Sequence, residues 1–286
     1  MKKACVVIGI LTFVLAFSPV NSEAGTFIVG AKYWQTSWDS AVLDWFQKDI
    51  GAAFKATGAT LQSDVGRGKG YMTGPVFGYQ TDDGTWSFSF AAMALSHFSQ
   101  DWQGTAGTMD LNTNIDTTRR DFDFAVTYSL ARHKDTLSFL EYCRIFLGYK
   151  YQTVDYDLKL QYNTAMGIRN YNYKLDANVH MPTVGVGIVY PIFDKLVFGL
   201  QGGVGLALID LVMTDPDGKD FDIDPKYSFA FNTEANLNIL PVKDLVVQIG
   251  FRYQEWYLKA RSPQRWDTTE SRDTTYGPTL TIVYAF

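Results

Sequence analysis

Charged residues alternate with aromatic residues in several short segments of the chain. The clearest are Phe122-Asp123-Phe124, Tyr149-Lys150-Tyr151 and Phe251-Arg252-Tyr253. In an extended strand successive side chains point to opposite faces, so each charge lies on the face opposite its aromatic neighbours. Lipid cannot solvate such a polar face, which we therefore expect to point into the lumen of a closed sheet. The residues assigned to this lumen are Lys32, Asp123, Arg144, Lys150, Glu234 and Arg252.

A lumen with both signs of charge has two interpretations. The charges could form a selectivity constriction for small polar solutes. Alternatively, they could pair with one another and fill a barrel too narrow to conduct. Counting back from the turn at Pro241 places Glu234 diagonal to Arg252 on neighbouring strands, which predicts an ion pair between them. The sequence leaves both interpretations open.

A second group of residues predicts a helix in the first long loop. Trp38, Val42, Trp45 and Phe46 recur at helical spacing, and Ser37 or Asp39 is a suitable cap. Such an amphipathic helix could fold into a barrel mouth as a lid, lie on a membrane surface or bind a partner. We expect packing against the rim.

An acidic loop follows further along the chain. It offers four alternating carboxylates that could hold Ca²⁺ or Mg²⁺. Its glycine is misplaced for a helix-loop-helix calcium motif, and no Glu closes the site, so a solvated loop without metal is expected. No cofactor is expected either. The four carboxylates are Asp215, Asp217, Asp220 and Asp222.

The elements that would position these residues are ten strands joined alternately by short turns and long loops. Twelve strands would be possible if the first loop contained a hairpin. The first nine predicted strands are 26–37, 71–80, 85–98, 119–132, 139–152, 179–190, 196–209, 226–240 and 245–258. The four short turns lie at 81–84, 133–135, 193–195 and 241–244. The five longer loops are 38–70, 99–118, 153–178, 210–225 and 259–274.

The tenth strand ends the chain at residues 276–286, where an apolar face alternates with a small or polar one and the last residue is Phe286. At the other end, Lys2 and Lys3 precede an apolar run at 4–17 and the sequence Ser22-Glu23-Ala24. This pattern predicts an export signal at 1–24, cleaved after Ala24. Together with such a signal, the closing strand resembles that of bacterial outer-membrane β-barrels. The resemblance to the general barrel pattern covers residues 25–286. The resemblance implies an all-β, closed antiparallel barrel in the outer membrane of a Gram-negative-type envelope. Its implied partners are outer-membrane lipids, lipopolysaccharide and, through the closing strand, the barrel-assembly machinery.

Composition agrees with a barrel. Aromatic residues make up 15% of the chain while the mean hydropathy is only −0.09, as expected if every second residue of a strand meets lipid. The net charge of −5 argues against nucleic acid as a partner. Cys143 is the only cysteine after the predicted signal, which excludes an internal disulfide.

One motif raises the alternative of an enzyme. The segment Ser96-His97-Phe98-Ser99 resembles the His-x-Ser pair of outer-membrane phospholipases and lipid A deacylases, with His97 and Ser99 as candidate catalytic residues. Those enzymes attack lipid from the outer wall, whereas this pair is predicted to face the lumen. The Asp-His pair of the ten-stranded omptin proteases has no match around the histidines of this chain. We therefore expect no enzymatic activity.

Three functions remain, in order of preference. The first is a small or gated passive pore for small polar solutes. The second is a non-conducting barrel whose extracellular loops bind a surface partner or support the envelope. The third is a lipid-active hydrolase.

Overall fold

The computed structural model describes residues 25–56, 67–96, 98–106, 109–164, 167–223, 225–261 and 268–286. The predicted export signal at 1–24 lies outside the described residues.

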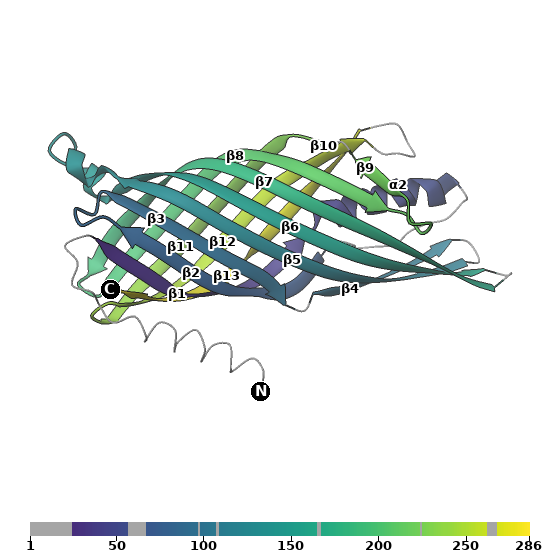
Figure 1. Ribbon diagram of the computed structural model, residues 1–286, viewed down its shortest axis with the longest axis horizontal. Helices are drawn as coiled ribbons and strands as arrows, with labels where there is room; N and C mark the ends of the chain where they lie inside the picture. Colours follow the sequence, from purple (N-terminus) through teal and green to yellow (C-terminus); the bar gives the residue numbers. More distant parts are fainter. Residues whose placement is uncertain are drawn as a thin grey trace.

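The described residues form a closed, antiparallel ten-stranded barrel, as predicted (Figure 1). Neighbouring strands of the wall follow the order β1-β2-β3-β5-β6-β7-β8-β11-β12-β13 and back to β1. The wall strands are β1 (Thr26–Asp39), β2 (Arg67–Gln80), β3 (Trp86–Ser96), β5 (Met109–Ser129), β6 (Cys143–Thr164), β7 (Gly167–Phe193), β8 (Leu196–Thr214), β11 (Ser228–Val242), β12 (Leu245–Arg261) and β13 (Thr268–Ala285). Shorter strands β4 (Ser99–Ala106), β9 (Asp220–Ile223) and β10 (Pro225–Lys226) pair with β5, β8 and β12.

The barrel closes where β13 pairs with both β12 and β1. The backbone amides of Phe27 and Phe286 each donate to the carbonyl of the other residue, both at 2.9 Å. Both ends of the described chain therefore lie at the same end of the barrel, called here the terminal end. The opposite end, which carries the long connections, is called the loop end.

An exposed apolar belt surrounds the half of the barrel nearer the terminal end. Val186 is 65% exposed, Leu147 65% and Phe229 75%, although all three lie within regular strands. Stacked or tilted ring pairs such as Tyr33–Tyr71 and Phe251–Tyr276 border the belt toward the loop end. The arrangement is that of a wall facing hydrocarbon, with aromatic rings at its edge.

Beyond this belt the polarity of the two faces is exchanged while the alternation continues. On β6, Tyr149 and Tyr151 precede the outward, polar Asp155, whereas the inward positions change from Lys150 to the buried Leu158. The predicted loops at 99–118 and 153–178 were therefore wrong: β5, β6 and β7 continue as strands through most of them. Toward the loop end, water surrounds the wall and apolar side chains fill the lumen. The polarity of the two faces is therefore the reverse of the one that lipid imposes on the same strand nearer the terminal end.

One predicted turn was also wrong. The fourth strand ends at Ser129 rather than Arg132, and the connection at 133–135 is part of a longer segment. That segment contains two 3-10 helices, η1 (Leu130–His133) and η2 (Ser138–Tyr142). The Ser129 side chain caps η1 by accepting from the amide of Ala131, which ends the strand early.

Candidate pore and its plug

The lumen at the loop end is filled by a helix. Helix α2 (Ala41–Ala56) follows β1 directly and is part of the connection to β2. Trp45, Leu43 and Phe46 are buried with at most 1% exposure, packed among inward side chains of the wall. Of the described helices, none has the length and apolar character needed to span a bilayer.

The helix begins later than predicted, because its cap lies one residue beyond Asp39 and three residues beyond Ser37. Ser40, rather than Ser37 or Asp39, caps it by accepting a hydrogen bond from the amide of Leu43 at 3.3 Å. Trp38 belongs to β1 and not to the helix, although it joins Val42, Trp45 and Phe46 in one buried cluster. Because these residues are buried against wall strands, the helix is a plug inside the barrel.

On the side of the plug nearer the terminal end, a layer of paired charges crosses the lumen. Arg119 on β5 makes two 3.0 Å hydrogen bonds to the carboxylate of Asp121, and it also donates to Thr275 at 2.7 Å. Lys150 on β6 lies 2.5 Å from the same Asp121 and 3.7 Å from Asp123. Buried charges need such partners, because an isolated charge out of water is costly.

Two further ion pairs complete the layer. Arg252 donates to Asp123 at 2.7 Å, and Lys32 donates to both carboxylate oxygens of Glu234 at 2.8 and 3.1 Å. The predicted pair of Glu234 with Arg252 was wrong, although the two residues face each other in the β11–β12 ladder. A register shift between Ile239 and Val242 moves Arg252 opposite Glu234, and both side chains then reach across the lumen to other strands.

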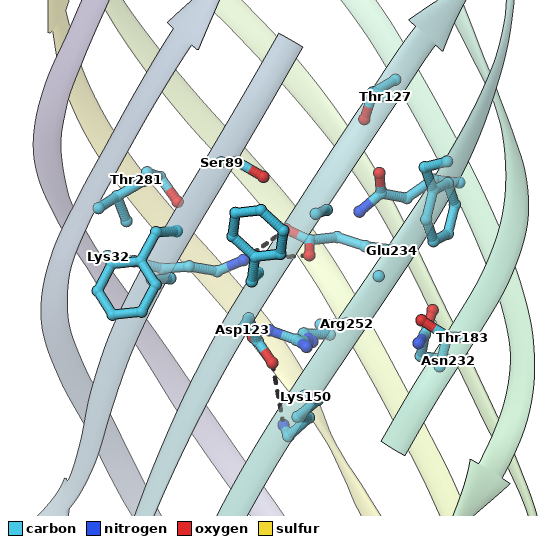
Figure 2. Close-up of a pocket in the computed structure, with 18 of the residues that line it drawn as sticks. Lys32, Ser89, Asp123, Thr127, Lys150, Thr183, Asn232, Glu234, Arg252 and Thr281 are labelled. Atoms are coloured by element: carbon cyan, nitrogen blue, oxygen red, sulfur yellow. Dashed lines mark hydrogen bonds and ion pairs between the residues drawn. The ribbon is translucent and has the colours of Figure 1, made fainter. Parts of the chain in front are cut away.

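Between this layer and the terminal end lies a polar cavity of about 330 Å³. Figure 2 shows Lys32, Glu234, Asp123 and Arg252 pointing into it from four strands. Its further polar lining includes Ser89, Thr127, Lys150, Thr183, Gln201, Asn232, Thr233, Asn236, Gln248 and Thr281. Five of the six residues assigned to the lumen therefore line one cavity.

Arg144 is the exception. It is the second residue of β6, near the terminal end, and does not belong to the cavity lining. The ring of Phe146 on the same strand instead fills space beside the glycines of β7 and β8: a Cβ on Gly203 would lie 2.9 Å from its Cζ. Small residues on this wall thus accommodate an aromatic side chain rather than widen the lumen.

A buried carboxylate links the plug to the wall. Asp273 on β13 accepts from Trp38 Nε1 at 2.9 Å and from the backbone amide of Ala41 at 3.3 Å. Its other oxygen, Oδ1, is buried and has no hydrogen-bond partner. Tyr276 belongs to a ring pair at the edge of the apolar belt. Asp273 lies three residues nearer the loop end on the same strand, so it is outside the belt. Burial raises the pKa of Asp273 to about 6, despite the opposing effect of Arg119.

Sequence reasoning did not single out Arg119 or Asp273. Arg119 could have been found, because it lies two positions before Asp121 and thus on the same face of the strand. Asp273 falls in a segment read as loop, 235 positions from its partner Trp38, and gave no local signal.

Comparisons with known proteins agree on the architecture. No family model matches the chain, and no curated protein matches its sequence. Among solved structures, the outer membrane protease OmpT from Escherichia coli matches 95% of this chain and 99% of its own, with a TM-score of 0.52 and 10% identity. The fold is that of a bacterial outer-membrane β-barrel. The translocator domain of the autotransporter NalP from Neisseria meningitidis matches 100% of this chain and 95% of its own, with a TM-score of 0.46 and 7% identity. At 10% identity, the comparison with OmpT establishes the fold alone.

The remaining candidate residues of this barrel form no common site within the described part of the chain. His97 lies outside the described residues, and Ser99 begins β4 at the loop end. In the acidic loop, Asp215 accepts from the amides of Asp217 and Lys219, and Asp220 accepts from Thr214. Among the described residues, no three His, Cys, Asp or Glu side chains are placed to share a metal ion.

Proposed function

We propose that the chain is a gated pore of a Gram-negative outer membrane, closed at rest and passing small polar solutes when α2 leaves the lumen. The terminal end then faces the periplasm and the loop end the exterior, since barrels of this kind place their long connections outside. The outer wall would contact lipids and lipopolysaccharide, and the closing strand the barrel-assembly machinery. No reaction is assigned to the chain.

The observation that carries the proposal is the polar cavity at the level of the apolar belt. A barrel serving only as a scaffold could fill this space with side chains, as small barrels do. Here about 330 Å³ remains and polar groups line it, and a single water needs only about 10–15 Å³ measured in the same way. The charges that border the cavity would set ion preference once the pathway is open.

The plug accounts for the closed state. Burying a large apolar side chain contributes about 1.5–3 kcal/mol, and Val42, Leu43, Trp45 and Phe46 are all buried with α2 in place. The docked state therefore dominates without a trigger, and the full chain should be silent or open only briefly.

Planar-bilayer recording tests the proposal. The refolded chain from Gly25 to Phe286 is compared with a variant carrying Trp45→Asp and Phe46→Asp, which cannot keep α2 in an apolar lumen. Steady, ion-selective currents in the variant alone would support a gate. Addition of Glu234→Gln to that variant should then change ion preference.

A variant that folds with α2 displaced yet stays silent would overturn the pore. It would favour the alternative, a non-conducting barrel that displays a surface. One observation favours that alternative: β6 and β7, with 22 and 27 residues, extend beyond the apolar belt at the loop end. Figure 1 shows the two strands projecting at that end. Lipid hydrolysis by the refolded parent, lost in Ser99→Ala, would favour an enzyme instead.

A further inference from the structure

The contact between α2 and β13 contains a carboxylate in an unusual position. Asp273 is only 1% exposed, and the hydrogen bonds that it accepts from Trp38 and Ala41 both reach one oxygen, Oδ2. The donors are Trp38, at the end of β1, and Ala41, the first residue of α2. The burial of this carboxylate and the docking of the helix therefore occur together.

The cation whose charge acts on this carboxylate, Arg119, does not hydrogen-bond to it. Arg119 stacks on the Trp38 ring, 4.7 Å from its centroid, but donates to Asp121, Gln152 and Thr275. Asp273 thus receives only a through-space attraction from Arg119, and Asp121 on the same strand opposes it. A buried carboxylate without a hydrogen-bonded cation favours its protonated form.

The other titratable groups at this contact are already engaged. Tyr156 on β6 shares a hydrogen bond with Ser40, and burial raises its pKa well above the ordinary value. On α2, Lys48 pairs with Asp44 at 2.6 Å and donates to the carbonyl of Glu270 at 2.9 Å.

We propose that Asp273 is a proton-controlled latch, which holds α2 in the lumen more tightly at acid than at neutral pH. When α2 leaves, β13 loses its cover and Asp273 returns to water. Docking then takes up a proton over the pH range in which the buried carboxyl is protonated and the exposed one is not. As a control of conduction, the latch rests on the gated pore proposed above.

The direction of the pH dependence follows from the raised pKa of Asp273. The docked Asp273 has a pKa of about 6 and its ordinary value is 3.8. Protonation of Asp273 therefore favours docking fully below pH 3.8, and this favourable contribution is lost as the pH rises through about 6. The ratio of docked to undocked helix should therefore fall about tenfold between pH 5 and pH 7.

The test reads α2 directly, without current. Val42→Cys is introduced in a Cys143→Ser background, and the rate of its modification by a thiol reagent is measured at pH 5 and pH 7. The same rates are measured with Asp273→Asn, which keeps an acceptor for Trp38 but has no charge to lose. Taking the ratio of the two rates at each pH cancels the ionisation of the cysteine itself.

The expected result is a parent-to-variant ratio about tenfold higher at pH 7 than at pH 5. The exposed acid Asp44 in the same helix provides a matched control, because Asp44→Asn should keep the parental pH dependence. A ratio that does not change with pH would overturn the latch. If Asp273→Asn fails to fold, the parent rate normalised to an exposed Lys134→Cys gives the same answer.

Bilayer currents of the same proteins separate the two proposals. Labelling that changes with pH while the current stays at zero would keep the latch and remove the pore. A current whose pH dependence survives in Asp273→Asn would keep the pore and remove the latch.

Discussion

Lys32 and Glu234 are 202 positions apart in the chain, yet Lys32 Nζ lies 2.8 and 3.1 Å from the two carboxylate oxygens of Glu234. Their strands, β1 and β11, are not neighbours, because β13 and β12 lie between them in the wall. The pair therefore spans the lumen instead of following a ladder. It ties together parts of the wall that lie three strands apart, and it borders the polar cavity.

Removal of one partner of this pair should destabilise the barrel. Glu234→Gln leaves the Lys32 ammonium, about 10% exposed, without its counter-charge. Breaking a buried pair in this way costs about 3–5 kcal/mol. We expect a fall in the free energy of unfolding near the lower end of that range, measured by urea titration of the refolded protein.

A surface pair supplies the matched control. Lys259 and Glu270 are 3.1 Å apart with half-exposed side chains, so Glu270→Gln should cost less than about 1 kcal/mol. Equal losses in both variants would contradict the role given to the luminal pair. Addition of Lys32→Met to Glu234→Gln should recover part of the loss.

Substitution of Gly203 tests the packing of the glycine wall. A Cβ on Gly203 would lie 2.9 Å from Phe146 Cζ and 3.2 Å from Asn232 Oδ1, so Gly203→Ala forces these side chains to move. Overpacking of this kind costs about 1–3 kcal/mol. Gly202→Ala is the control, because its nearest neighbour would be at 3.9 Å. Thermal unfolding should rank the two variants, and Phe146→Leu should relieve the clash.

Truncation of Trp45 should loosen the plug without opening the wall. Its side chain is fully buried and its indole Nε1 has no hydrogen-bond partner. A Trp→Ala change in a core costs about 3–5 kcal/mol. In the Val42→Cys labelling assay we expect a much faster reaction for Trp45→Ala, with gel migration of the folded barrel unchanged. Lys48→Ala removes a half-exposed ion pair and one exposed hydrogen bond to the carbonyl of Glu270, so its labelling rate should rise far less than that of Trp45→Ala.

The turn between β2 and β3 should be sensitive to strong acid. Asp83 accepts from Thr81 Oγ1 at 2.7 Å and from the amide of Thr85 at 2.9 Å. The hydrogen bond from Thr81 is the largest of the effects that lower the pKa of Asp83 to about 2. A lowered pKa stabilises the fold above the ordinary value of 3.8, and this stability is lost as the pH falls toward 2. The urea midpoint of the parent should therefore fall more steeply between pH 4 and pH 2 than that of Asp83→Asn, and parallel curves would contradict the assignment.

The alternating pattern in the sequence determined the ten strands and the outward apolar face. It also located the closing strand at 276–286, which the structure begins eight residues earlier, at Thr268. Hydrocarbon solvates one face of a strand and excludes polar groups from it, so every strand carries the rule locally. The same rule placed Lys32, Asp123, Lys150, Glu234 and Arg252 on inward faces. The continuation of β5 to β7 was missed because beyond the belt water lies outside and an apolar plug inside, which reverses the polarity of the two faces.

The tertiary structure alone decided which charges meet and what fills the lumen. Lys32 reaches Glu234 only because the wall closes, and Asp273 meets Trp38 and Ala41 only because β13 lies beside β1. Alternation assigns a side chain to a face, but not to a partner on a distant strand. That choice depends on barrel closure and strand register, which bring together residues that the chain keeps far apart.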